Sequence, residues 1–385
     1  MSHPIVQFGT SRFLQAHVDL FVSQALERGQ ALGRITVVQT SGNPVSRARV
    51  AALASGAPYP VRIRGLHDGA IVDTTLHSTS IAEARDASLD WPLLRARFEH
   101  DVRVVVSNTG DSGYAGFDTD TAASLEAGAA APRGFAAKLA VLLHGRFLAG
   151  AAPITLLPCE LVSANGDTLG ELVIGIARAW QCDAALIDYL RDGCIWVNSL
   201  VDRIVSEPIE PAGAVAEPYA LWAIERRAGM VLPCEHASIV LTDDLAHVER
   251  LKLWLLNLGH TVLAAQWLNA GRPQGLSVAE AMNDEAWRAP LEALWRDDVL
   301  PVFDALGEAH GTAARAYLVT VRERFANPFL RHRIADIAQH HASKLERRLR
   351  PVRDEARRLG LGLAHTRLDA VLAGGGPGVA AAQVA

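Results

Sequence analysis

The sequence predicts an α/β protein, in which an N-terminal Rossmann-like, doubly wound parallel sheet is followed by a mostly α-helical C-terminal domain. Short β-branched runs alternate with helical stretches through the first half. After about residue 223, apolar residues recur at spacings of three and four instead. Because 385 residues suffice for two domains, we expect a nucleotide-binding domain at 1–226, a helical substrate domain at 227–372 and a flexible tail at 373–385.

In the first half, the expected elements follow one another as in βαβ units. They are a strand at Ile5–Phe8, a helix at Arg12–Arg28, a strand at Ile35–Gln39, a helix at Pro44–Ala54, a strand at Val102–Ser107, a helix at Gly134–Leu148, a strand at Ile154–Leu157 and a helix at Thr168–Trp180. Alternating apolar and polar residues around Asp68 and Gly69 predict a hairpin, inserted into this sheet or added to its edge.

In the second half, the apolar spacing predicts long helices. We expect them at Leu245–Leu268, Ala286–Phe303, Ala313–Phe325 and Leu330–Leu349. The arginine-rich run from Lys344 to Arg358 also contains acidic residues, so we interpret it as a solvated helix face rather than an anion site.

The charge balance and the cysteines limit the possible partners. With 37 Lys and Arg against 42 Asp and Glu, the chain has no overall basic field, and we expect neither a nucleic-acid nor a membrane partner. No apolar run has the length of a membrane span or a signal peptide, which predicts a cytoplasmic protein. The 4 cysteines lack metal-ligand spacing, so we expect reduced thiols and no metal site.

The turn after the first strand is the first candidate cofactor site, because a doubly wound fold binds a dinucleotide pyrophosphate there. Of the pattern GxGxxG only Gly9 is present, and an ordinary strand-to-helix connection stays an equal alternative. The candidate cofactor residues of this turn are Phe8, Gly9, Thr10, Ser11, Arg12 and Phe13.

The end of the second strand leaves the choice between NAD and NADP open. An NAD enzyme usually places an acidic residue there for the adenosine ribose, and this chain has Gln39. Arg47 and Arg49 follow closely and are candidates for a 2′-phosphate, although exposed helix arginines are the simpler interpretation.

Two further loops follow buried strands, where the ligand crevice of an open parallel sheet lies. The first contains Ser107, Asn108 and Thr109, and the second runs from Pro158 to Asp167, with Glu160 and Asn165. Two such loops in corresponding places predict a crevice.

Four polar residues interrupt an apolar helical run between positions 249 and 268. On an α-helix, Lys252, Glu249, His260 and Asn257 fall at about 0°, 60°, 80° and 140°, which is less than half of the circumference. Buried polar groups need partners, and a substrate is one possible partner. A satisfied polar cluster in the core is the alternative.

The spacing Lys252-x4-Asn257-x2-His260 resembles the catalytic motif of the polyol-specific long-chain dehydrogenases, which include mannitol 2-dehydrogenase and the hexuronate reductases. The similarity extends along nearly the whole chain. Further matching segments are Ser107–Thr109, Pro158–Leu161, Asn165–Asp167, Leu200–Val205, Ala279–Asp284, Arg324–Pro328 and Ser343–Lys344. Leu161 and Asp336 replace an Asn and an Arg of the mannitol enzymes, which favours the hexuronate reductases.

The resemblance implies a metal-independent oxidoreductase that uses NAD, with NADP not excluded. Lys252 would be the general acid and base, Asn257 and His260 would hold the oxyanion, and Glu249 would pass protons to the lysine. Asp202, Lys344 and Glu160 would contact the substrate. Reducing a ketone by hydride requires a proton donor and fixed donors at the oxygen, which these residue types supply.

The expected substrate pair is a ketohexuronate and an aldonate, with tagaturonate and altronate first. A free polyol such as mannitol or arabinitol is the alternative within the enzymes, and a catalytically silent nucleotide-binding sensor is the alternative outside them. We expect a monomer or a homodimer.

Overall fold

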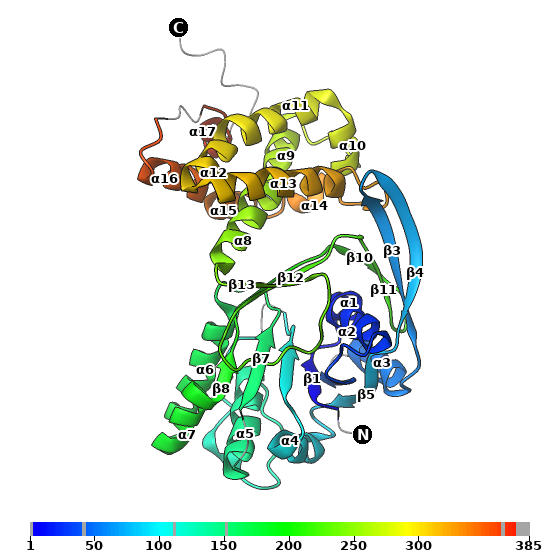
Figure 1. Ribbon diagram of the computed structural model, residues 1–385, viewed down its shortest axis with the longest axis vertical. Coiled ribbons are helices and arrows are strands. Elements are labelled where there is room, and N and C mark those ends of the chain that lie inside the picture. The colour runs from blue at the N-terminus through cyan, green and yellow to red at the C-terminus, as the bar shows by residue number, and fades with distance from the viewer. Residues whose placement is uncertain (1–2, 41–43, 111–112, 151–152, 363–365, 375–385) are drawn as a thin grey trace. The chain divides into compact units, whose positions relative to one another are not determined.

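A six-stranded parallel sheet forms the centre of the N-terminal part (Figure 1). The computed structural model describes residues 3–40, 44–110, 113–150, 153–362 and 366–374. The strands are β1 (Ile5–Phe8), β2 (Ile35–Gln39), β5 (Ile81–Asp86), β6 (Val104–Ser107), β7 (Ile154–Pro158) and β8 (Cys194–Trp196), in the order β5-β2-β1-β6-β7-β8. This is the order of a doubly wound dinucleotide-binding sheet, and the predicted fold class is confirmed.

Helices cover this sheet, and β1, β2, β6 and β7 are buried along their whole lengths. The helices are α1 (Arg12–Ala16), α2 (Val18–Glu27), α3 (Pro44–Ala54), α4 (Trp91–His100), α5 (Phe135–Leu148), α6 (Asn165–Ala179) and α7 (Ala184–Asp188). Phe8 packs between α4 and α5, with its ring centroid 6.1 Å from Phe98 and 5.2 Å from Phe135. The helix predicted at Arg12–Arg28 is broken at His17, whose backbone has ψ −93°.

The hairpin predicted for the parallel sheet belongs instead to a sheet of its own, so that prediction is wrong. Strands β3 (Tyr59–His67) and β4 (Ala70–Ser78) join β10 (Val205–Pro208) and β11 (Ala214–Ala216) in the order β10-β11-β3-β4. The predicted turn is present, because Asp68 and Gly69 both have positive φ. The pairing partner of β3 comes from a segment about 150 residues later, which local periodicity does not reveal.

A third sheet closes the N-terminal unit. It contains β9 (Ser199–Asp202), β12 (Leu221–Glu225) and β13 (Ile239–Thr242), in the order β13-β12-β9. Because β13 pairs with β12, the N-terminal compact unit extends to Leu245. The tip of the hairpin, Arg64–Asp73, and Glu217–Tyr219 belong to the second compact unit. The domain boundary at residues 226 and 227 stays a prediction from the sequence.

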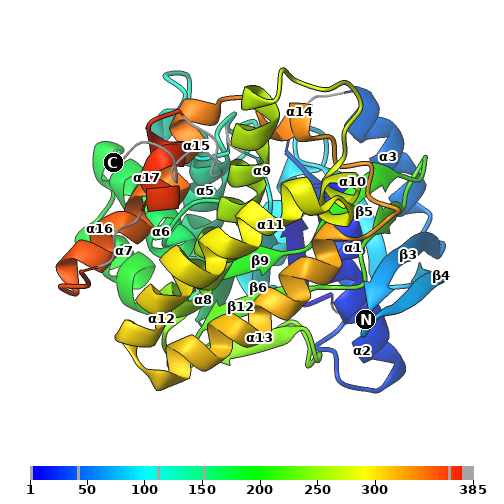
Figure 2. The ribbon, with the colours of Figure 1, turned by 90° about the horizontal axis from the view of Figure 1, so that it is seen from above.

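The second unit is helical, as the sequence predicts. Its elements are α8 (Leu245–Leu251), α9 (Leu258–Asn269), α10 (Val278–Asn283), α11 (Glu285–Leu294), α12 (Leu300–Leu306), α13 (Glu308–Phe325), α14 (Ile334–Ile337), α15 (His341–Arg348), α16 (Arg350–Arg358) and α17 (Thr366–Leu372). Figure 2 shows α13 running beside α11 and α12, and an Arg322–Glu292 ion pair joins α13 to α11. Trp295, Phe303 and Phe325 are fully or almost fully buried in its core.

Three of the four long helices predicted for this half are divided. Leu245–Leu268 and Ala286–Phe303 each contain a π-helical segment, η3 (Lys252–Asn257) and η4 (Trp295–Val299). Leu330–Leu349 separates into α14 and α15, with His340 in the left-handed region at φ 54°. None of the helices in the described ranges is long and apolar enough to cross a membrane. The tail from residue 375 onward lies outside the described residues.

Candidate active-site residues

The turn after β1 is a close approach of two backbones. Gly9 has φ +120°, and a Cβ atom there would lie 2.6 Å from the carbonyl oxygen of Asn108. Ser11 caps α1 by accepting a hydrogen bond from the Leu14 amide at 3.2 Å, and its hydroxyl donates to Asn108 at 3.3 Å. A side chain would fill this cradle, so the residue there must be glycine. A tight glycine turn at the end of β1 fits a dinucleotide.

The other predicted residues of this turn differ in how accessible they are. The Phe8 side chain is buried in the core. The carbonyl of Thr10 accepts hydrogen bonds from Gln15 at 3.2 Å and from Arg49 at 3.0 Å. Arg12 is exposed, and Phe13 stacks on His17 at 4.8 Å between ring centroids. Of these side chains, Arg12 is the one presented to solvent.

Glu160 fixes the loop that follows β6. Its carboxylate accepts hydrogen bonds from the Ser107 hydroxyl and from the amide and hydroxyl of Thr109, each at 3.0 Å. The Asn108 side chain donates to the Cys159 carbonyl at 2.9 Å. Glu160 is 5% exposed, so these contacts replace its lost hydration. The two predicted loops do lie together, and Glu160 is the residue that joins them.

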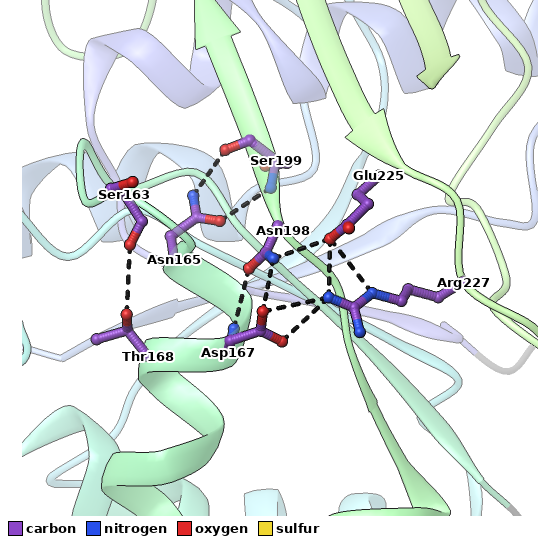
Figure 3. Close-up of polar contacts among 8 residues, drawn as sticks. All are labelled: Ser163, Asn165, Asp167, Thr168, Asn198, Ser199, Glu225 and Arg227. Carbon is purple, nitrogen blue, oxygen red and sulfur yellow. Dashed lines mark hydrogen bonds and ion pairs between the residues drawn. The ribbon is translucent and has the colours of Figure 1, made fainter. Parts of the chain in front are cut away.

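The side chain of Asn165, at the start of α6, is bonded to neighbouring backbone groups (Figure 3). Its amide nitrogen donates to the carbonyls of Pro158, Glu160 and Ser199, at 3.0, 3.1 and 2.9 Å. Its side-chain oxygen accepts from the Ser199 amide at 2.9 Å. These contacts tie the end of β7 to β9. A cofactor contact of Asn165 stays a prediction.

Asn198 and Asp167 belong to a second set of polar contacts, beside Asn165 (Figure 3). Asn198 donates to Asp167 and to Glu225, at 2.8 Å each, and Arg227 donates to both carboxylates. Asp202 lies at the end of β9 and is nearly completely buried, with 4% of the residue exposed. A contact of Asp202 with substrate stays a prediction.

The residues at and after the end of β2 bear on the choice between NAD and NADP. Gln39 is 2% exposed, and Thr40 after it lines a pocket of about 410 Å³ together with Thr109. Arg49 is engaged with the Thr10 carbonyl and lies 3.6 Å from Glu210, whereas Arg47 is exposed. The pocket lies at the carboxyl ends of the central strands, where a doubly wound sheet binds its cofactor.

In the helical unit, Lys252 begins the π-helical segment η3 and Asn257 ends it. A π-helix makes hydrogen bonds between residues five apart, so residues at that spacing are about one turn from each other. Lys252 and Asn257 have this spacing. The separation of about 140° expected on an α-helix is therefore wrong. Single π-helical turns are frequent at functional sites.

His260 is held against an aromatic ring one turn into α9. It is 7% exposed, with its ring centroid 4.3 Å from Phe325 and 4.9 Å from His332. The preceding Gly259 allows this packing, because a Cβ atom there would lie 2.5 Å from Trp295. The plane of the His260 ring is thus set by its neighbours. Glu249 lies half-buried on α8, three residues before Lys252.

The carbonyl oxygen of Asn257 has side-chain donors. Thr261 donates its hydroxyl proton to this oxygen at 2.9 Å, and Arg348 donates at 3.2 Å. Arg348 also donates to the Thr261 hydroxyl at 3.1 Å. These two side chains hold the backbone of Asn257, where the π-helical segment ends. The interpretation of Arg348 as part of a solvated face is wrong.

Four cationic or titratable side chains gather around this end of α9, and we call them the cationic cluster: His332, His341, Lys344 and Arg348. Burial, and then the charge of Arg348, lowers the pKa of Lys344, whose ammonium donates to the Ile337 carbonyl at 2.6 Å. Burial also lowers the pKa values of His332 and His341, with a further contribution from Lys344. For His332, Asp336 acts in the opposite direction.

These pKa shifts report that positive charge is costly in the cluster. An anion bound there would reduce that cost. Among the residues with described positions, no group of three His, Cys, Asp or Glu side chains is placed to hold a metal ion. The 4 cysteines, all within the described ranges, are free thiols.

Sequence reasoning missed several of these residues. His332 and His341 fall outside the motif, and Arg348 is hidden in the arginine-rich run. One signal was available for Arg348: it lies four residues after Lys344, on the same helix face.

Comparisons with known proteins identify the family. Residues 93–231 match the mannitol dehydrogenase Rossmann domain, and residues 244–375 match the mannitol dehydrogenase C-terminal domain. A protein named altronate oxidoreductase from Halalkalibacterium halodurans is 30% identical over 373 residues, covering 90% of this chain and 69% of that protein. The chain belongs to the mannitol dehydrogenase family.

Other members extend this result. An altronate oxidoreductase from Klebsiella pneumoniae is 30% identical over 375 residues, which cover 90% of this chain and 74% of the relative. The predicted family is confirmed, and as a member of the mannitol dehydrogenase family the chain is an oxidoreductase that acts on CH–OH groups.

Solved structures share the fold. A D-sorbitol dehydrogenase in substrate-free form has a TM-score of 0.83 and 22% identity, covering 97% of this chain and 80% of that one. The Pseudomonas fluorescens mannitol 2-dehydrogenase, in a ternary complex with NAD and D-mannitol, has a TM-score of 0.74 and 20% identity, covering 97% and 79%.

Proposed function

We propose that the chain is an NAD-dependent oxidoreductase that interconverts a ketohexuronate and an aldonate, with tagaturonate and altronate as the pair. The observation that carries the substrate class is the cationic cluster beside the helical segment of Lys252, Asn257 and His260, which we call the motif helix. Lys344 and the two histidines have lowered pKa values, so a carboxylate from the substrate would stabilise their charged forms. A neutral polyol has no group that would do so. Relatives named altronate oxidoreductase support the same choice.

The nucleotide-binding unit supports NAD as the cofactor. The Gly9 turn, the loop clamped by Glu160 and the pocket beside Thr40 all lie at the carboxyl ends of the parallel strands. When bound, the reduced nicotinamide would supply the hydride that converts the ketone to an alcohol. The protein must then stabilise the negative charge that develops on the carbonyl oxygen.

We assign the proton and the oxyanion contacts to the motif helix. The Lys252 ammonium donates a proton to the carbonyl oxygen as hydride arrives, and it must be neutral for the reverse oxidation. The Asn257 amide and a ring N–H of His260 hold the oxyanion. Packing on Phe325 fixes the His260 ring, and the Arg348 and Thr261 contacts fix the Asn257 backbone. Glu249, one turn before Lys252, passes the proton to solvent.

The substrate residues complete the assignment. Lys344 receives the uronate carboxylate, and Asp202 accepts hydrogen bonds from sugar hydroxyls. Glu160 acts through the loop that it clamps, in addition to any substrate contact. The cytoplasmic location and the monomeric or homodimeric state belong to the same proposal and rest on the sequence.

A substrate panel tests this function. The absorbance of the reduced nicotinamide is followed with tagaturonate, fructuronate, fructose and mannitol, in the direction appropriate to each. We expect kcat/KM for tagaturonate to exceed that for fructose by at least about a hundredfold, since a well-placed charge contact contributes about 2–3 kcal/mol. Equal or faster turnover of fructose or mannitol would show that the chain is a polyol dehydrogenase.

A further inference from the structure

The pocket beside Thr40 contains two cationic side chains that the cofactor motifs do not include. Its volume of about 410 Å³ is in the range of small-ligand sites. Thr40, Ser88 and Thr109 line it from the carboxyl ends of β2, β5 and β6, and Arg133 and Lys138 line it from the start of α5. Among the described residues that line it, none is acidic.

Lys138 is a buried ammonium with donors to spare for a ligand. It is 3% exposed, and it donates to the carbonyl of Arg133 at 2.8 Å. An ammonium carries three N–H donors, so the bond to Arg133 uses one of them. Burial lowers the pKa of Lys138 to about 8, although Asp120 and Asp86 act in the opposite direction. An anion in the pocket would offset the cost of that buried charge.

The nearby carboxylates are engaged with other donors. Asp120 accepts hydrogen bonds from the backbone amides of Arg133 and Gly134, at 2.8 and 2.7 Å. Asp86 accepts from the amide and hydroxyl of Ser88, at 2.9 and 2.5 Å. These contacts hold both carboxylates on backbone and hydroxyl groups.

Arg133 places a second cation at the same pocket. Its guanidinium carbon lies 5.0 Å from the centroid of the Phe117 ring, which also lines the pocket. By contrast, the two arginines that the sequence suggested for a 2′-phosphate are less suited. Arg49 is engaged with the Thr10 carbonyl and Glu210, and neither Arg47 nor Arg49 lines this pocket among the residues described for it.

We propose that this pocket holds the adenosine half of the cofactor, and that Lys138 and Arg133 bind a phosphate on the 2′-oxygen of its ribose. The chain then accepts NADP as well as NAD. The geometry that carries this inference is the pairing of two cations with three hydroxyl side chains, in a pocket whose described lining residues include no carboxylate. The inference rests on the proposed nucleotide-dependent function, and it adds a specificity that the function alone does not require.

Binding of nucleotide fragments tests the inference without using catalysis. Isothermal titration calorimetry measures the affinity of the full chain for adenosine 2′,5′-bisphosphate and for 5′-AMP. We expect the wild type to bind the bisphosphate at least as tightly as 5′-AMP. Lys138→Met should weaken the bisphosphate at least about tenfold, which is roughly 1.4 kcal/mol, and 5′-AMP by less than about threefold.

Two further variants complete the experiment. Arg133→Met, at an exposed side chain, should weaken the bisphosphate selectively by about threefold or more and gives a reading even if Lys138→Met fails to fold. Arg47→Met is the matched control and should change neither affinity. Selective loss of the bisphosphate in Arg47→Met, or equal loss of both nucleotides in Lys138→Met and Arg133→Met, would overturn the inference.

The outcomes also separate this inference from the proposed function. A wild type that binds 5′-AMP but binds the bisphosphate more weakly refutes the 2′-phosphate site alone. A wild type that binds neither nucleotide refutes the nucleotide-dependent function as well. Nucleotide binding without turnover of any sugar acid refutes the proposed substrate and leaves the 2′-phosphate site standing.

Discussion

The loops after β6 and β7 and the helix that carries Lys252 use their polar side chains in opposite ways. In the loops, Glu160 and Asn165 are buried and bonded to neighbouring backbone and hydroxyl groups. In the helical unit, burial, with a smaller contribution from neighbouring positive charge, lowers the pKa values of Lys344, His332 and His341 in the cationic cluster. The difference indicates that the loops after β6 and β7 present a fixed backbone surface, whereas the cationic cluster presents buried positive charge that an anionic group would stabilise.

The largest expected effect is on the chemical step at Lys252. Lys252→Ala should lower kcat by at least about 10²-fold while NADH still binds, because a general acid and base typically contributes 10²- to 10⁴-fold. Stopped-flow turnover and NADH fluorescence titration measure the two quantities. Near-normal turnover in this variant would remove Lys252 from the mechanism.

The pH dependence of the two reaction directions is a second test of Lys252. Ketone reduction needs the ammonium and alcohol oxidation needs the amine, so the oxidation rate should rise with pH where the reduction rate falls. Parallel pH profiles in the two directions would contradict the assignment.

Glu160→Gln tests the hydrogen bonds by which the Glu160 carboxylate holds Ser107 and Thr109. Glutamine keeps one acceptor oxygen, so one of the donors on Ser107 and Thr109 would face an NH₂ group. We expect the Kd for NADH to rise about tenfold and the free energy of unfolding to fall by about 1–3 kcal/mol. Glu171→Gln, at an exposed position on α6, is the control. Unchanged NADH affinity in Glu160→Gln would show that the loop does not need the clamp.

Arg348→Met tests whether Arg348 acts by positioning Asn257 or by its charge. Losing one donor to the Asn257 carbonyl should cost about 1 kcal/mol in the transition state, which is roughly a fivefold lower kcat. The decrease should be similar for charged and neutral substrates, and Arg348→Lys should recover part of it. The neighbouring exposed Arg347→Met is the control. A change in melting temperature with kcat unchanged would give Arg348 a structural role alone.

The last expected effect does not concern catalysis: it is on the pH dependence of stability in the nucleotide-binding unit. Burial raises the pKa of Asp19 to about 7, although Tyr59 donates a hydrogen bond to it at 2.9 Å. The native state keeps a proton that the unfolded chain releases near pH 4, so stability falls as pH rises from about 4 to 7. Asp19→Asn should remove this component, and its melting temperature should fall several degrees less than that of the wild type over this range. Identical pH dependence in calorimetry would show that Asp19 is ionised throughout.

Much of the fold could be predicted because its signals are local. The buried β-branched strands and the spacing of apolar residues gave the central sheet and the helical unit. The separate sheet of β3 depends on pairing with β11, which lies far away in the chain. The spacing of apolar residues along the chain does not predict such contacts.

The candidate site divides in the same way. The turn at Gly9 and the motif from Lys252 to His260 are visible as residue patterns. The π-helical segment is not, because apolar spacing near 3.6 continues through it. Arg348 and Lys138 look like a solvated arginine and an ordinary helix lysine, and their roles depend on what folding places beside them.

The central claim is that Lys344, within the cationic cluster, selects a carboxylate, and Lys344→Met tests it most directly. The ratio of kcat/KM for tagaturonate to kcat/KM for fructose is measured in the wild type and in this variant, with Arg347→Met as the control on the same helix. We predict that the KM for tagaturonate rises at least about tenfold, roughly 1.4 kcal/mol, and that fructose is affected far less, so the ratio falls about tenfold. Equal losses on both substrates would contradict the claim, because Lys344 would then support the fold or the general substrate pose and not the carboxylate.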